Sequence, residues 1–388
     1  MPIIEYTPGL FDDLQEMVER VPANMNLTHR PFVDYYYATQ PWCKLYLYIS
    51  DSGKVVGTLG RELLRFEHQC EGGIREISVR IGSNWFSLHP GVGGELIKFS
   101  AAANPNSFGM TLVVSRKALT VLQHYGWVPL PGVRGYFLNG PCTLYPGKAW
   151  WKHTTNATVR LLGGRNISKF AGRIAADVRE RLSVCEESSY SKDLLPRRSP
   201  FIFRFAPTVE YLDWRYNLSL TFVRYRLFRI LGRGGTIGYV ILNEAQNHIM
   251  VAQCDGEDAT ALAYGILMAV VEASRKDERP RTVFLSCCHA EMQQVFEQFG
   301  FRMELWGGEL PFAFRTVPPQ LDVSAAGTAQ WLVNYDWCDN GLQAPFLDQG
   351  RCGDWGRNIP PAEGVGGNSS LSLGSCWHER GPSTARLI

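Results

Sequence analysis

The chain has 388 residues, of which 45% are hydrophobic, and its formal net charge is +2 at pH 7. This length predicts two domains and a tail, and the near-zero charge excludes a general attraction to nucleic acid or anionic membranes. No apolar stretch predicts a transmembrane helix, and the first residues lack the basic and apolar regions of a signal peptide. The ten cysteines form no CxxC pair, which is typical of reduced thiols, so we expect a cytoplasmic protein without a metal site.

Hydrophobic periodicity predicts a strand, two helices and a three-stranded antiparallel meander at the start of the chain. The expected ranges are a strand at 3–6, helices at 10–21 and 30–38, and strands at 44–49, 55–66 and 74–88. A glycine-rich turn then opens a helix at 95–103, and a buried strand is expected at 108–114. A helix at 116–125 ends at Gly126, and we expect residues 133–138 to pair back as the last strand of this half.

The second part of the chain follows a linker predicted at 141–155 and repeats this order. We expect helices at 166–184 and 208–216, a loop at 186–200, strands at 222–231, 236–242 and 248–253, a helix at 259–274, and a strand–helix–strand unit at 282–286, 289–299 and 301–305. The apolar helix at 259–274 is too short for a membrane span and predicts a buried core helix. Residues 318–388 are rich in glycine, serine and proline and predict a loosely ordered tail, with 331–337 as a candidate docked segment.

The two halves share more than their order of elements. Gly57 and Gly238 each lie early in the second strand of a meander, and Gly126 and Gly300 each close a helix before an aromatic residue. We therefore predict a tandem α/β (α+β) protein with domains at 1–140 and 156–317, each a mixed, mostly antiparallel sheet flanked by helices. Two unrelated α/β domains with convergent patterns are the alternative.

The glycine-rich turn within residues 88–97 is the leading local candidate for a ligand site. It stands between a predicted strand and a predicted helix, so its backbone N–H groups lie at the positive end of the helix dipole. Such a turn can hold a phosphate because glycine has no Cβ that keeps the anion away from the backbone. A tight turn without a ligand has the same pattern, and the turn alone does not decide between the two.

The order of elements, the glycine turn after the fourth strand and the helix–Gly–aromatic endings resemble the GNAT superfamily of acyl-CoA N-acyltransferases over residues 1 to about 317. The resemblance implies acetyl-CoA or another acyl-CoA as co-substrate, held between splayed fourth and fifth strands with its pyrophosphate on the turn, and no metal. The residues it assigns to this donor are Phe86, Ser87, Leu88, Gly91, Val92, Gly93, Gly94 and Ser115. The segment YLDWRY at 211–216 also resembles acyltransferase-like proteins encoded with bacterial polysaccharide genes.

The chain departs from the family pattern at several places. No Gln or Arg precedes the glycines of the first turn, and three acids at 254–259 would repel a pyrophosphate in the second half. We therefore expect only the first half to bind CoA. Leu122 and Phe296 stand where the family often places the tyrosine that protonates the thiolate, which leaves Tyr125 as the candidate acid.

Acyl transfer to an amine also needs a base and a donor of hydrogen bonds to the oxyanion. Backbone N–H groups of the splayed fourth strand are the expected oxyanion donors, and Glu76 on that strand is the candidate base. Glu76 as a solvated strand-edge carboxylate and Tyr125 as a packing residue are the structural alternatives. His89 beside the turn either contacts phosphate or only begins the helix.

Two further motifs invite a functional interpretation. Cys287, Cys288 and His289 are candidate metal ligands or nucleophiles, but adjacent cysteines cannot both face one metal comfortably, so a structural role is favoured. Arginines alternate with apolar and aromatic residues at 224–229, which fits either a basic binding face or an ordinary solvated strand, and the low net charge favours the strand.

The leading hypothesis is an acyl-CoA-dependent N-acyltransferase that transfers an acetyl or other acyl group to a small-molecule amine, for example an amino sugar or another small metabolite. We expect no nucleic-acid or membrane partner, and an acceptor cleft shared by the two halves. The alternative is a catalytically inactive GNAT-like scaffold or binding protein, because neither half keeps the full phosphate pattern or the tyrosine. A third possibility is a different donor, such as an aminoacyl-tRNA or an acyl carrier protein.

Overall fold

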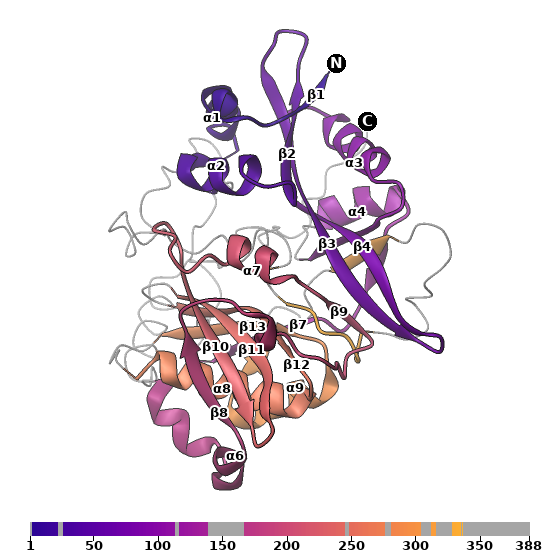
Figure 1. The fold of residues 1–388 in the computed structure, drawn as a ribbon. Helices are drawn as coiled ribbons and strands as arrows, with labels where there is room; N and C mark the ends of the chain where they lie inside the picture. The colour runs from indigo at the N-terminus through magenta and orange to yellow at the C-terminus, as the bar shows by residue number, and fades with distance from the viewer. Residues whose placement is uncertain are drawn as a thin grey trace, which may run out of the picture.

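The structure is a computed structural model that describes residues 2–21, 26–112, 116–138, 167–244, 248–275, 281–303, 312–315, 328–334 and 336. It has two lobes, each built on one sheet with helices against it, and it confirms the predicted fold class (Figure 1). The predicted linker and most of the predicted tail lie outside the described residues. None of the described helices combines the length and the apolar character that a membrane crossing requires.

The first lobe follows the predicted order of elements. They are β1 (Ile3–Glu5), α1 (Phe11–Val18), α2 (Arg30–Ala38), β2 (Cys43–Ile49), β3 (Val55–Cys70), β4 (Gly73–Ser87), α3 (Val92–Ala103), β5 (Phe108–Leu112), α4 (Arg116–His124) and β6 (Val128–Leu130). Strands β2, β3 and β4 form the expected antiparallel meander, and β5 is parallel to β4. The long β3–β4 hairpin extends along the second lobe, where β9 (Phe203–Phe205) pairs with β3 (Figure 1).

The second lobe repeats the meander and the two helices that follow it. It contains a 3-10 helix (Ile167–Arg173), α6 (Ala176–Arg181), β8 (Ser183–Glu187), α7 (Val209–Arg215), β10 (Arg224–Gly232), β11 (Gly235–Glu244), β12 (His248–Gly256), α8 (Ala259–Ala273), β13 (Thr282–Cys287), α9 (Ala290–Phe299) and β14 (Arg302–Met303). The single helix predicted at 166–184 is wrong. Gly172 lies in the 3-10 segment, only six residues continue as α6, and the next residues form an edge strand on β10.

The two lobes exchange one strand each. Strand β7 (Arg134–Leu138) leaves the first half and lies between β13 and β14 in the sheet of the second lobe. Strand β15 (Phe312–Arg315) leaves the second half and lies between β5 and β6 in the sheet of the first lobe, where Figure 1 shows its orange ribbon beside the purple strands. The prediction that residues 133–138 close the sheet of their own half is therefore wrong, because alternation identifies a strand but not its partner.

The repeat extends to matched details of the two lobes. Gly57 pairs with the last residue of β4, and Gly238 pairs with the last residue of β12. Helices α4 and α9 both end at a glycine with positive φ, and the aromatic residue that follows donates its N–H to a carbonyl in the last turn of the helix. Equivalent residues thus terminate equivalent elements in both halves.

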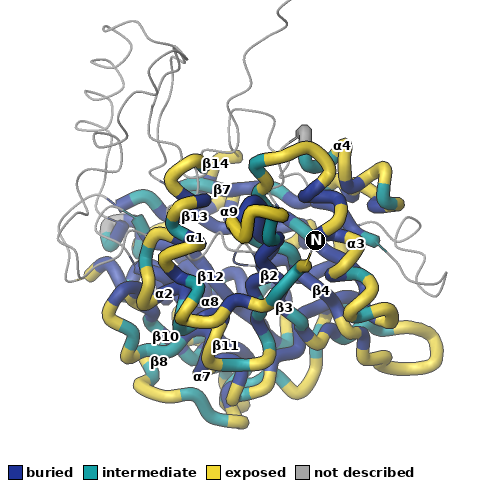
Figure 2. Tube along the Cα trace, turned by 90° about the horizontal axis from the view of Figure 1, so that it is seen from above, coloured by how far each residue is buried: buried dark blue, intermediate teal, exposed yellow. Residues whose placement is uncertain are grey.

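Buried residues concentrate along the two sheets and the helix faces against them (Figure 2). Helix α8 is apolar on nearly all sides and most of its residues are buried, which confirms the prediction of a core helix. Further clusters lie between the sheet of the first lobe and helices α3 and α4, and between the lobes.

His248, at the start of β12, predicts a loss of stability in acid. Burial, and to a smaller degree the charge of Arg281, lowers the pKa of His248 to about 4. Below pH 6.5 the unfolded chain binds a proton that the folded chain does not, so stability declines as pH falls from about 6.5 to 4. Between pH 7.5 and 4.5, we expect the free energy of unfolding of His248→Gln to fall by roughly 2–3 kcal/mol less than that of the wild type. Urea unfolding at the two pH values measures this difference. Parallel pH profiles of the two proteins would contradict this expectation.

Candidate functional site

Strands β4 and β5 run parallel but separate after a short contact. They pair only over residues 79–81 and 108–110, whereas β4 continues to Ser87. Between the pairs Gly60–Ser83 and Thr58–Phe86, two residues of β4, Asn84 and Trp85, lie opposite a single residue of β3. Asn84 has a φ of 46°. This bulge turns the free end of β4 and interrupts its hydrogen bonds to β3. The two strands therefore splay, as the resemblance implied.

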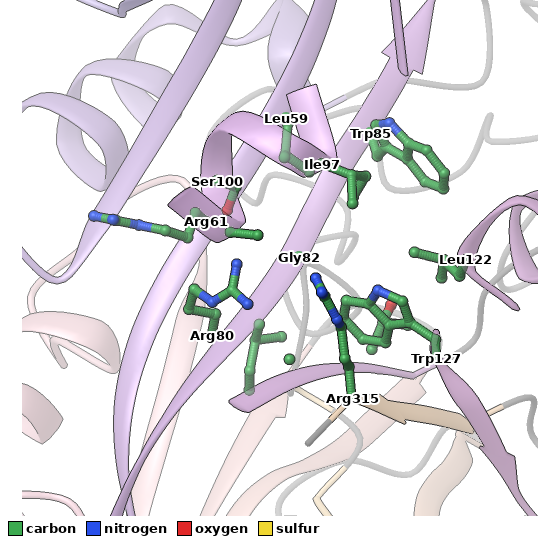
Figure 3. Close-up of a pocket in the computed structure, with 14 residues that line it drawn as sticks. Leu59, Arg61, Arg80, Gly82, Trp85, Ile97, Ser100, Leu122, Trp127 and Arg315 are labelled. Carbon is green, nitrogen blue, oxygen red and sulfur yellow. The ribbon is translucent and has the colours of Figure 1, made fainter. Parts of the chain in front are cut away.

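A cavity lies in this splay, on the face of the sheet that α3 and α4 cover (Figure 3). Its volume is about 510 Å³ when the space open to solvent is included. Leu59, Trp85, Leu122 and Trp127 are among its apolar wall residues. Leu122 therefore faces the splay at the position where the family often has its acid, and it offers no proton.

The glycine turn brings the amino terminus of α3 to the edge of the splay. Gly91 precedes the helix with a φ of 85°, a conformation that side chains disfavour, and no side chain caps the helix. Among the described residues, no side chain therefore competes with an anion for the first-turn N–H groups. Gly93 lies against the indole of Trp85, which donates to the Gly93 carbonyl at 3.1 Å, and Gly94 lies against the Tyr125 ring. These two glycines thus permit close packing beneath the helix start.

The corresponding helix start in the second lobe is occupied by the chain's own carboxylate. Asp258 precedes α8, and its side chain accepts a hydrogen bond from Ala261 N–H at 2.7 Å. Glu257 accepts one from Arg197 N–H at 2.9 Å. A side-chain carboxylate here satisfies the helix and repels a pyrophosphate.

The second splay is also filled by the chain itself. Strands β12 and β13 pair only over residues 248–250 and 282–284 before they separate. Segment 331–334 lies between them: Asn334 bonds to Cys254, Ser286 donates to the Val333 carbonyl, and Cys288 donates to the Trp331 carbonyl. Residues Trp331 to Asn334 are all buried. This observation confirms that part of the predicted segment 331–337 docks, and it leaves in this splay a hollow of about 280 Å³, compared with about 510 Å³ in the first lobe.

The residues that the resemblance assigned to the donor gather mainly at one edge of the first lobe. Phe86 and Leu88 are half-buried against the core, and Ser87 is exposed at the end of β4. Gly91 is exposed on the turn, whereas Val92, Gly93 and Gly94 are buried in the first turn of α3. Ser115 lies outside the described residues.

The three side chains proposed for chemistry lie apart. Tyr125 contacts the glycine turn at Gly94 and is not among the residues that line the cavity. Glu76 lies near the far end of β4, with its side chain 63% exposed and paired with Arg65 at 3.0 Å. His89 is exposed on the turn and borders a different hollow, beside Lys54. The structure therefore brings the candidate acid to the turn but not the candidate base.

Sequence reasoning missed the charged end of the cavity. Arg61 on β3, Arg80 on β4 and Arg315 on β15 line it together. Arg80 interrupts an apolar strand between Val79 and Ile81, which is a usable signal, but Arg315 lies on a strand that we did not predict.

The Cys287–Cys288–His289 motif and the arginines of β10 make contacts that support the fold. Burial raises the pKa of the Cys287 thiol to about 12 and that of Cys288 well above its ordinary range, which disfavours the thiolate. No group of three potential metal ligands occurs among the described residues. The arginines of β10 form ion pairs: Arg224 and Arg226 with Glu244, and Arg229 with Glu187.

Comparison with known proteins supports the fold assignment. No protein-family profile matches the sequence, and no curated protein matches it significantly. The structure is similar to N-myristoyltransferase from Saccharomyces cerevisiae, solved with myristoyl-CoA bound, with a TM-score of 0.51 and 10% identity over 86% of this chain and 89% of that one. A probable N-acyltransferase from Enterococcus faecalis gives a TM-score of 0.49, with 9% identity over 81% and 72%. A tandem GNAT protein from the clavulanic acid biosynthesis pathway gives 0.44, with 13% identity over 82% and 99%.

The chain shares the fold of this N-myristoyltransferase. Its two lobes each carry the meander, the helix after the fourth strand and the splay. Only the first lobe combines an open splay with an uncapped helix start among the described residues.

Proposed function

We propose that the protein is an acyl-CoA-dependent N-acyltransferase whose donor binds in the first lobe. The observation that supports this function is the contrast between the lobes. The first has an open splay whose neighbouring helix lacks a side-chain cap, whereas the second has its splay filled by 331–334 and its helix capped by Asp258. A single chain thus keeps one donor site and blocks the other.

The residues present fit an acyl-CoA in general terms. The α3 amino terminus offers N–H groups to the pyrophosphate, and the free edge of β4 beyond Ile81 offers backbone groups to the pantetheine arm. The bulge at Asn84 and Trp85 presents backbone groups that do not follow the regular β3 ladder, and these are the candidate oxyanion donors. The acceptor is a small-molecule amine.

A second function, binding without catalysis, is favoured by one observation. Leu122 lines the splay where the family often has its acid, and the Tyr125 side chain packs against Gly94 instead of lining the cavity. A scaffold of this kind would bind CoA but would not release it from acetyl-CoA in the presence of amines. Turnover measured as free thiol separates the two functions.

The binding step is tested by a charge placed beside the α3 amino terminus. Pro90 is exposed directly before Gly91, so Pro90→Glu adds a carboxylate without disturbing the core. We expect CoA to bind about 5- to 10-fold more weakly to Pro90→Glu than to the neutral Pro90→Gln. This difference in affinity should become smaller in high salt, which screens the added charge. Calorimetric titration with CoA measures both variants.

Two results would count against this placement of the donor. If the wild type gives no heat with millimolar CoA, the chain does not bind CoA at all. If Pro90→Glu and Pro90→Gln bind CoA equally at low salt, the pyrophosphate does not lie at α3. Asp258→Asn serves as the control in the second lobe and should leave CoA binding unchanged.

A further inference from the structure

Three arginines line the cavity at the closed end of the β4–β5 splay, and Figure 3 shows Arg61 directed away from the other two. Arg80 and Arg315 are both in register with Gly109 of β5, one from each neighbouring strand, and so lie on the same face of the sheet. Figure 3 shows their side chains directed toward one another in the cavity. Arg61 lies opposite Gly82 on the adjacent pair of strands, and its guanidinium carbon lies 5.4 Å from the Tyr46 ring centre. Gly82 has no side chain and Trp127 packs over Gly109, so the arginines and this indole line the same cavity.

This arginine cluster (Arg61, Arg80 and Arg315) has no counter-charge in the described part of the chain. No aspartate or glutamate lines the cavity, and none of the three forms an ion pair with a described residue. Arg61 and Arg80 are both more than nine-tenths buried, and the Nε atom of each has no hydrogen-bond partner. Burial and the charges of Arg315 and Arg61 lower the pKa of Arg80 to about 10.

Two other buried arginines of this chain each pair with carboxylates. Arg204 pairs with Glu67 and Asp255, and Arg215 pairs with Glu62 and Asp336. Each of these two guanidiniums has two carboxylates, as expected for a charge removed from water. Among the described residues, this cluster differs from Arg204 and Arg215 in having no carboxylate partner, and it lies in the cavity proposed to hold substrate.

We propose that the arginine cluster binds the carboxylate of a substrate, so that one of the two substrates of the transferase is an acid. This inference rests on the proposed function, because it places the anion at the closed end of the donor splay. A guanidinium pair suits a carboxylate, which it binds through parallel charge-assisted hydrogen bonds. The cavity is open to solvent and holds room for a small charged group beside Arg80 and Arg315.

The carboxylate could belong to either substrate, and matched pairs of compounds distinguish the two. Succinyl-CoA and butyryl-CoA have acyl chains of equal length, with and without a terminal carboxylate. As acceptors, γ-aminobutyrate and butylamine differ in the same way. Preference for succinyl-CoA places the anion on the acyl group, and preference for γ-aminobutyrate places it on the amine. No preference in either pair contradicts the proposal.

Free succinate and its diamide test the cluster without CoA. By calorimetry we expect succinate, and not the diamide, to bind the wild-type chain, and to bind roughly 10- to 100-fold more weakly to Arg80→Met and to Arg315→Met. Arg65→Met is the control, because Arg65 is on the exposed hairpin and pairs with Glu76. Its succinate affinity should equal that of the wild type.

Thermal unfolding separates a binding role from a structural one. Because Arg80 is buried without a counter-charge among the residues that the structure describes, Arg80→Met should unfold at a higher temperature than the wild type while it loses succinate. A lower melting temperature with unchanged succinate affinity would overturn the proposal. If CoA binds but succinate does not, only this inference fails. If succinate binds but CoA does not, the proposed function fails and the anion site stands.

Discussion

Expressed separately, the two halves of the chain, cut within the predicted linker at 141–155, are expected not to fold. Each sheet would lose an internal strand, because β15 belongs to the second fragment and β7 to the first. Strand β15 alone buries Phe312 and Phe314, worth about 2–3 kcal/mol each, against a total stability of about 5–15 kcal/mol. We expect neither fragment alone to unfold cooperatively by circular dichroism, and the co-expressed pair to form a 1:1 complex that does.

A cleavable version of the full chain is the matched control. With a protease site placed in the same linker, the folded protein should remain one particle after cleavage, because the exchanged strands hold the two pieces together. Two fragments that fold separately and do not associate would show that the strand exchange is absent in solution.

Removal of Arg215 is expected to destabilise the folded chain far more than removal of an exposed arginine. Arg215 on α7 is fully buried, 3.2 Å from Glu62 of β3 and 3.3 Å from Asp336. Tyr211 also donates to Glu62 at 2.6 Å. Arg215→Met would remove the guanidinium that pairs with two buried carboxylates, which costs about 3–5 kcal/mol. Urea unfolding measures this loss.

An exposed arginine provides the comparison for Arg215. Arg224 is 62% exposed and pairs with Glu244 at 3.5 Å, so Arg224→Met should cost about 1 kcal/mol or less. Adding Glu62→Gln and Asp336→Asn to Arg215→Met removes the charges of the two carboxylates and should restore part of the lost stability. A loss no larger than that of Arg224→Met would show that the buried network contributes little.

Much of the local structure follows from the sequence because local rules act there. The alternation of β2, β3 and β4, the glycine stops at Gly126 and Gly300 and the apolar helix α8 all depend on neighbours close in the chain. The glycine turn was identifiable for the same reason, since strand, glycines and helix follow one another directly. The failed helix at 166–184 shows where periodicity alone was insufficient: residues beyond Leu182 pair as an edge strand with β10, about forty positions later.

The repeated domain plan, the glycine turn and the acids that disfavour a donor in the second lobe can all be recognised from residues near one another in the chain. That β7 and β15 change lobes, that 331–334 docks in the second splay, and that Arg61, Arg80 and Arg315 line one cavity is visible in the folded chain alone. These outcomes depend on pairing between residues tens to hundreds of positions apart. Alternation records which face of a strand is buried, but it does not record which strand will lie beside it.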